Sequence, residues 1–69
     1  MPNHTTVSTA QYRVELSPAL DLWMRGARFG TVQREYTNKH GKRVCVVKMD
    51  HPQVKRPVRI LSDYLAVIS

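Results

Sequence analysis

The sequence predicts an all-β fold: a small barrel of about five short antiparallel strands, with a single 3₁₀ turn before the last strand. Three observations predict it. A run of strongly β-forming residues lies at 43–49, the segment 11–16 alternates between apolar and polar residues, and turn residues recur at short intervals. Short strands at such close spacing, with a helical turn before the last one, indicate a small closed barrel.

The firmest element is a hairpin at 28–50. Its second strand, at 43–49, is rich in β-branched residues, which fit a pleated surface, and its first strand lies at 29–36. Between the strands, Gly41 can take a positive φ without a Cβ clash, and Asn38 tolerates such a conformation. Alternation along 42–49 predicts two faces, and which of them lines the core stays open. One face has Lys42, Val44, Val46 and Lys48, and the other has Arg43, Cys45, Val47 and Met49.

The N-terminal third contains a tail and a strand. Residues 1–9 are polar and lack periodicity, so we expect a flexible tail, followed by one domain at 10–69. The alternating segment 11–16 has the period of a half-buried strand and would pair with the barrel edge or with a second copy of the chain. Its apolar face is the reason to expect a homo-oligomer.

The segment 20–24 permits two interpretations. Pro18 suits the first turn of a short helix, with Ser17 before it. However, Leu20, Leu22 and Met24 alternate with polar or aromatic residues, and this alternation favours a strand.

The remaining elements follow from turn chemistry. Gly26 lets the chain turn sharply after residue 24, and Asp and Pro residues predict a second turn after the hairpin, in which Asp50 bonds neighbouring backbone. Beyond it we expect a strand at 58–61, a 3₁₀ turn at 62–64 capped by Ser62 or Asp63, and a closing strand at 65–68.

Composition narrows the function. The 69 residues contain one cysteine, Cys45, which excludes an internal disulfide and fits a reducing, cytoplasmic setting. Cys45 lies in a predicted strand among apolar residues and is expected to be core. No apolar run reaches the ~20 residues of a membrane span. The three histidines are scattered, and no phosphate-binding glycine loop is present, so we expect neither cofactor nor enzymatic activity.

Charge points to a polyanionic partner. Eleven Lys and Arg residues against five Asp and Glu residues give a net charge of +6, which attracts nucleic acid, acidic proteins or anionic membranes. All the basic residues except Arg13 follow residue 24, so the folded domain carries the positive field.

A nucleic-acid site can be assigned from these residues. Arg34 and Tyr36 share a face of the first hairpin strand, so Tyr36 can stack on a base beside a phosphate bound by Arg34. Trp23 forms a second aromatic and basic cluster with Arg25 and Arg28. In the alternative interpretation, Trp23 and Tyr36 are structural and plug the ends of the barrel. The expected phosphate contacts are Arg25, Arg28, Arg34, Lys48, Lys55, Arg56 and Arg59.

The pattern from about residue 20 to residue 68 resembles an SH3-like barrel. Gly30 and Val32 at the start of the central hairpin are similar to the G-x-V of KOW-type modules in ribosomal and transcription factors, where the strand bends at Gly and the next apolar residue enters the core. The resemblance implies a barrel that binds RNA, DNA or protein, and the fold alone chooses none of them.

The layout from 28 to 68 is also similar to the plasmid-borne, trimethoprim-resistant type II dihydrofolate reductases. The shared features are His51-Pro52, Val58-Arg59-Ile60 and the closing apolar strand. That family builds a central pore from a V-Q-I-Y strand, whereas this chain has Val58-Arg59-Ile60-Leu61 there. Four copies of Arg59 in one pore would repel each other, so the comparison argues against reductase activity.

The sequence therefore predicts a small basic protein that binds nucleic acid, mainly through phosphates and with low sequence specificity. The competing class is a protein-interaction or self-associating adaptor module from a phage or other mobile element. Salt dependence separates the two, because phosphate binding weakens steeply as salt rises and an apolar protein interface does not.

Overall fold

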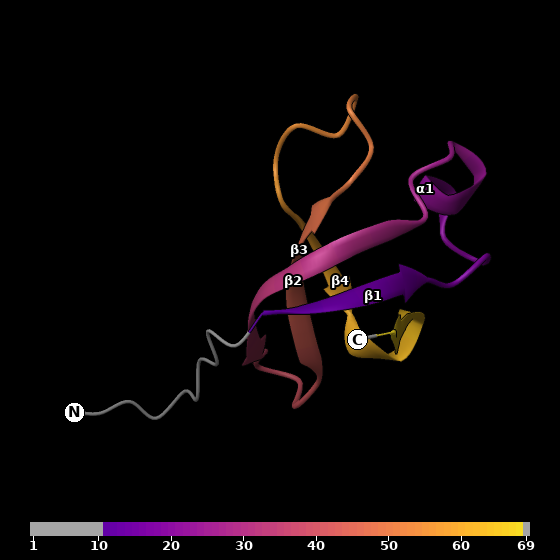
Figure 1. Ribbon diagram of the computed structural model, residues 1–69. Helices are drawn as coiled ribbons and strands as arrows, with labels where there is room; N and C mark the ends of the chain where they lie inside the picture. Colours follow the sequence, from indigo (N-terminus) through magenta and orange to yellow (C-terminus); the bar gives the residue numbers. More distant parts are fainter. Residues whose placement is uncertain (1–10, 69) are drawn as a thin grey trace.

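The computed structural model describes residues 11–68, and the predicted flexible tail at residues 1–9 lies outside this range. Within it, five antiparallel strands form one strongly curled sheet shaped as a half-barrel (Figure 1). The all-β class, the number of strands and the 3₁₀ turn before the last strand are thus confirmed. The elements are β1 (Tyr12–Leu16), α1 (Asp21–Met24), β2 (Phe29–Thr37), β3 (Arg43–Met49), β4 (Val58–Leu61), η1 (Ser62–Tyr64) and β5 (Leu65–Val67).

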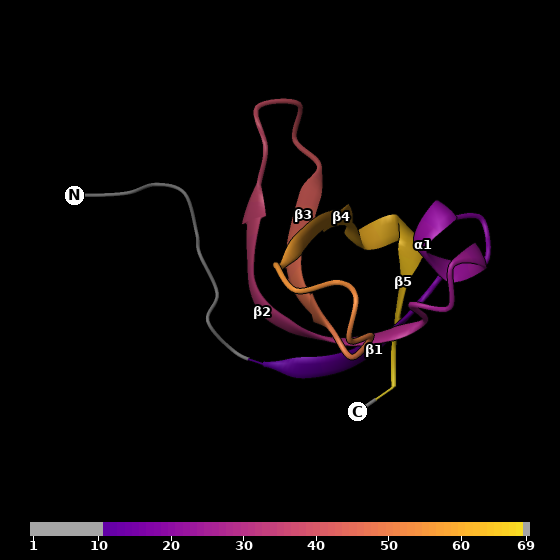
Figure 2. The ribbon, with the colours of Figure 1, turned by 90° about the horizontal axis from the view of Figure 1, so that it is seen from above.

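The order of the strands explains the curl. They follow the order β4-β3-β2-β1-β5, so β4 and β5 lie at opposite edges of the sheet and are joined only by η1. In a flat sheet these two strands would be separated by four strand spacings, about 19 Å. The four chain steps from Leu61 to Leu65 span at most about 14 Å. The sheet must therefore bend to bring its edges together, as the view from above shows (Figure 2).

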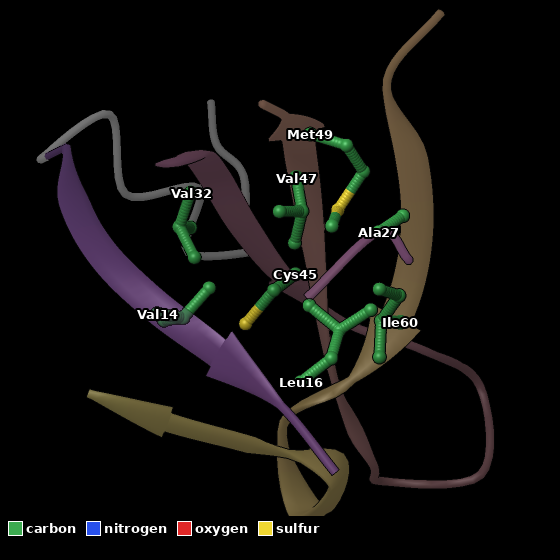
Figure 3. Close-up of a cluster of buried hydrophobic side chains, with 8 residues drawn as sticks. All are labelled: Val14, Leu16, Ala27, Val32, Cys45, Val47, Met49 and Ile60. Atoms are coloured by element: carbon green, nitrogen blue, oxygen red, sulfur yellow. The ribbon is translucent and has the colours of Figure 1, made fainter. Parts of the chain in front are cut away.

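The concave face of the sheet holds the core. Cys45, Val47 and Met49 share one face of β3, as the alternation predicted, and this face is the one that points inward. Their partners from the rest of the chain meet them there (Figure 3). The side chains that complete this cluster are Val14, Leu16, Ala27, Val32 and Ile60.

The β2–β3 hairpin is the longest pairing in the sheet, and its turn has the predicted chemistry in part. Gly41 has a φ of 77°, which a residue with a Cβ rarely adopts. Asn38 acts through its side chain: its Oδ1 accepts the backbone N–H groups of His40 at 2.9 Å and Lys42 at 3.0 Å. This Asx-type turn closes the hairpin.

Gly30 is required by packing. A Cβ at this position would lie 2.6 Å from Cγ1 of Val47 and 2.8 Å from the backbone oxygen of Lys48. The irregularity in the strand lies further on, where the register with β3 shifts between Val32 and Arg34. The bend predicted at Gly30 is thus a close approach of two strands, and a β-bulge at Gln33 follows it.

The prediction of a strand at 20–24 is wrong, because this segment contains the helix α1. The N–H of Leu20 bonds to the backbone oxygen of Ser17 at 3.0 Å, so the turn at Ser17-Pro18 leads directly into the helix. Leu20, Leu22 and Trp23 pack against the core, whereas Met24 is 79% exposed. The side chains that pack against the core are thus spaced as in a helical turn and not as in a strand.

Within the described residues no helix has the length and apolarity that a membrane span requires.

Two further expectations need correction. The N-cap position of η1 is occupied by Leu61, and no side chain forms a capping hydrogen bond. The cap predicted at Ser62 or Asp63 is therefore not formed. Strand β1 does not lie at an edge, because it pairs with β2 on one side and β5 on the other. Its apolar residues Val14 and Leu16 are buried in the chain's own core, and self-association stays a prediction without support from this strand.

Candidate nucleic-acid interface

The convex face of β2, β3 and β4 brings together four of the predicted contact residues. Arg34 of β2 and Arg59 of β4 both pair with Val46 of β3, from opposite sides. Directly opposed residues in antiparallel strands project to the same face, so both arginines flank Val46. One step along the sheet, Tyr36 and Leu61 flank Val44 in the same way, and Lys48 continues the row on β3. We call the seven residues Arg34, Tyr36, Val44, Val46, Lys48, Arg59 and Leu61 the basic face.

The β-bulge at Gln33 makes this face possible. Val32 points into the core, so plain alternation would also direct Arg34 and Tyr36 inward. The shift in register inserts one extra residue and turns both side chains to the convex side, opposite Val46 and Val44. The sequence predicted that Arg34 and Tyr36 share a face, but the bulge decides which face it is.

The basic face has an apolar floor. Val44 and Val46 are each only 7% exposed, although they point away from the core cluster. Neighbouring side chains on the same face must therefore cover them, and the long stem of an arginine can do so while its guanidinium stays in water. Adjacent strands are about 4.8 Å apart, which places the backbones of Arg34 and Arg59 about 10 Å from each other across β3.

The β3–β4 loop, at residues 50–57, adds charge at one end of this face. Lys48 Nζ donates to the backbone oxygen of Lys55 at 3.3 Å, so Lys55 lies beside the basic face, and Arg56 follows it as an exposed residue of the same loop (Figure 1). His51 organises the loop: its backbone oxygen accepts from Val54 at 3.1 Å, and its Nδ1 accepts from Gln53 at 3.2 Å.

The prediction that the Asp50 side chain bonds neighbouring backbone is wrong. Asp50 instead pairs with Arg13 of β1. Arg13 Nη1 donates to Asp50 Oδ1 at 2.9 Å and to Thr31 Oγ1 at 3.0 Å, so one guanidinium links β1, β2 and the end of β3. The hydrogen bonds and charge of Arg13 lower the pKa of the Asp50 carboxyl below its usual value.

Ion pairs elsewhere leave the basic face with unbalanced charge. Besides Asp50, Asp21 pairs with Arg25 at 2.9 Å, and Glu35 pairs with Arg43 at 3.4 Å. Glu35 opposes Cys45 and therefore projects to the concave side. No Asp or Glu occupies an outward position within β2, β3 or β4. On the convex side near Lys48, the carboxylate of Asp50 is paired with Arg13, which also bonds Thr31 opposite Lys48.

The second predicted cluster is engaged within the chain. The guanidinium of Arg28 lies over the Trp23 ring, 4.5 Å from its centroid, in a cation–π contact. Trp23 also packs against the core, in agreement with the alternative of a structural plug. Arg25 is bonded to Asp21. Both arginines thus have partners, whereas Arg34, Lys48 and Arg59 gather on the basic face.

One polar cluster was not predicted from the sequence. The Tyr12 hydroxyl donates to Glu35 and lies 3.7 Å from Cys45 Sγ. Burial is the main cause that raises the pKa of both Tyr12 and Cys45, and the Glu35 hydrogen bond raises that of Tyr12 further. The residues come from three strands, so only the folded register brings them together. A buried thiol kept protonated is a weak nucleophile.

No known family model matches the chain, and no curated protein or solved structure matches it either. Among residues 11–68, no three His, Cys, Asp or Glu side chains are grouped so that they could hold a metal ion. The site must therefore be interpreted from its own chemistry, which consists of cations around an apolar floor with one aromatic ring.

A cavity of about 330 Å³ lies beside the basic face, between α1 and β4. Arg59 and Leu61 belong to both the face and the wall of the cavity. The other lining residues are Leu20, Asp21, Leu22, Val58, Ile60 and Tyr64.

Proposed function

We propose that this protein binds nucleic acid through the basic face, mainly by contacts to phosphates and with low sequence specificity. The observation that carries the proposal is the arrangement of Arg34 and Arg59 on either side of β3, followed by Lys48, on outward positions of β2, β3 and β4 that include no Asp or Glu. Guanidinium groups bind phosphate oxygens with two parallel hydrogen bonds, and lysine adds a point charge. Lys55 and Arg56 would extend this contact along the loop.

Tyr36 gives the face a role beyond charge. It shares the convex side with Arg34, two residues away on β2, and is half-buried against the floor. An aromatic ring beside a phosphate-binding arginine offers a stacking surface for a base, which is tolerant of sequence because every base has a π-face. The only α-helix of the described residues has four residues, too short to read base edges along a major groove.

We propose that the curled five-stranded sheet is an SH3-like barrel, in which η1 leads into the closing strand, and that Gly30 and Val32 correspond to the G-x-V of KOW-type modules. We propose binding rather than catalysis. Arg59 stands where the type II dihydrofolate reductases have a glutamine, which speaks against that chemistry.

Titrations at two salt concentrations test the proposal. Fluorescence anisotropy with labelled single-stranded DNA, duplex DNA and RNA should show binding that weakens steeply with salt, by about 0.9 log units in affinity per phosphate contact and per log unit of salt on duplex DNA. Arg34→Ala or Arg59→Ala should weaken binding to unrelated sequences alike and lower the salt slope by about one.

Arg43→Ala is the matched control. It removes the same charge from the same sheet, but Arg43 pairs with Glu35 on the concave side. We expect a clearly smaller loss than for Arg34→Ala. Equal losses would mean that net charge alone attracts the ligand and that the basic face is not the site. Absence of binding by the folded wild type at about 50 mM salt, where phosphate attraction is strong, would overturn the proposal and favour the protein-interaction module instead.

A further inference from the structure

The cavity between α1 and β4 is lined mainly by apolar side chains. Its walls come from Leu20 and Leu22 on one side and from Val58, Ile60 and Leu61 on the other. Tyr64 adds an aromatic ring to the lining and is 41% exposed. A volume of about 330 Å³ is at the lower end of the range for small-ligand sites.

The cavity is continuous with the basic face. Arg59 and Leu61 line it and also project to the convex side, where Arg59 flanks Val46. A polyanion bound along the basic face would therefore pass the mouth of the cavity at Arg59. The single acidic residue of the lining, Asp21, is bonded through its carboxylate to Arg25 at 2.9 Å, so its charge is offset locally.

We infer that this cavity takes an unpaired base of a single-stranded nucleic acid, with the base against Tyr64 and the adjoining phosphate on Arg59. The inference rests on the proposed function and names the class of ligand. In a duplex the faces of the bases are stacked on each other, so a base can enter a side pocket only from a single strand. The chemistry of the site matches both parts of a nucleotide, because an aromatic and aliphatic pocket meets a guanidinium at its rim.

A pair of strands that differ only in their bases tests the inference. The probes are an oligothymidine of about twelve nucleotides and an abasic strand of the same length, which keeps every phosphate. Wild-type protein should bind the oligothymidine about tenfold more tightly than the abasic strand, since base stacking on an aromatic side chain contributes in this range. Tyr64→Leu should reduce this preference several-fold and leave the affinity for the abasic strand unchanged.

Phe29→Leu is the matched control for Tyr64→Leu. Phe29 is 42% exposed and does not line the cavity. Its replacement by leucine is the same aromatic-to-aliphatic change. We expect it to leave the preference intact. Circular dichroism checks that both variants fold. A second measurement needs no variant: in wild-type protein, the methyl resonances of Leu22 and Val58 should shift with oligothymidine and not with the abasic strand.

The outcomes separate this inference from the proposed function. If the wild type binds neither strand at about 50 mM salt, the proposed function fails and the base pocket with it. If both strands bind equally and the methyl resonances stay unchanged, phosphate binding stands and the base pocket is refuted. A full preference in Tyr64→Leu, or equal methyl shifts with duplex DNA of the same length, would also refute it.

Discussion

At the scale of single residues, two neighbouring valines of β3 are both buried but point to opposite faces of the sheet. Val47 is fully buried in the concave core, whereas Val46 points to the convex side between Arg34 and Arg59. Val47→Asp should unfold the domain, because an unpaired buried charge costs several kcal/mol and a small domain has only about 5 kcal/mol of stability. Val46→Asp should remain folded, since the two guanidinium groups can pair with the carboxylate. Thermal unfolding followed by circular dichroism distinguishes them, and similar behaviour of both variants would contradict the assignment of faces.

Gly30 tests how closely β2 and β3 approach. In Gly30→Ala, the new methyl group would lie 2.8 Å from a backbone oxygen that cannot move without disturbing the sheet. We expect a loss of about 1–3 kcal/mol in the free energy of unfolding, measured by urea titration. Gly41→Ala is the comparison, because nothing lies within 4 Å of its added Cβ and only the strain of a positive φ remains. A smaller effect at Gly30 than at Gly41 would argue against the close approach.

At the scale of elements, the bulge in β2 determines whether the basic face exists. Deletion of Gln33 would restore plain alternation and turn Arg34 and Tyr36 toward the core, alongside Val32. We expect this deletion variant to be unfolded or strongly destabilised, as measured by the dispersion of its proton–nitrogen NMR spectrum. Gln33→Ala, which keeps the residue count, should preserve both the fold and nucleic-acid affinity. A well-dispersed spectrum of the deletion variant with unchanged affinity would contradict the role of the bulge.

The elements that the sequence predicted well are those with local signals. The hairpin was predictable because Asn38 and Gly41 mark its turn and the β-branched run of β3 is unambiguous. Helix α1 was not predictable in this way. Over five residues, a strand and a helical turn can direct nearly the same side chains inward. Its conformation is decided by packing of Leu22 and Trp23 against a core that the sequence alone does not locate.

The same distinction applies to the site. That Arg34 and Tyr36 share a face follows from their spacing, and the structure places them together. Arg59 joins them only through the register of β4 on β3, and the cavity at Tyr64 depends on where α1 lies against β4. Both features require contacts between segments far apart in the sequence, for which a single sequence carries no signal.

At the scale of the whole molecule, the contact between the half-buried Tyr12 and the buried Cys45 predicts sensitivity to alkali. Both groups have raised pKa values in the folded state, so folding favours their protonated forms. Their contribution to stability is complete below the pKa values of the unfolded chain, about 8.5 for cysteine and 10 for tyrosine, and is lost as the pH rises beyond them. Urea unfolding at pH values from about 7 to 10.5 should show this decline. Cys45→Ala should flatten it between about 8.5 and 10, and an unchanged profile in this variant would contradict the assignment.

The pairing of β1 with β5 has a consequence for the order in which the molecule assembles. Strands β1 to β4 meet neighbours in sequence, but Leu16 and Leu65 pair across almost the whole domain. Closing so long a loop is slow and yields only a three-residue strand, so β5 should dock last during folding and detach first during local opening. Each such opening would expose one edge of β1 while the hairpin stays intact. Transient recognition by proteases or by other chains would therefore begin at the C-terminal strand, well before the domain unfolds.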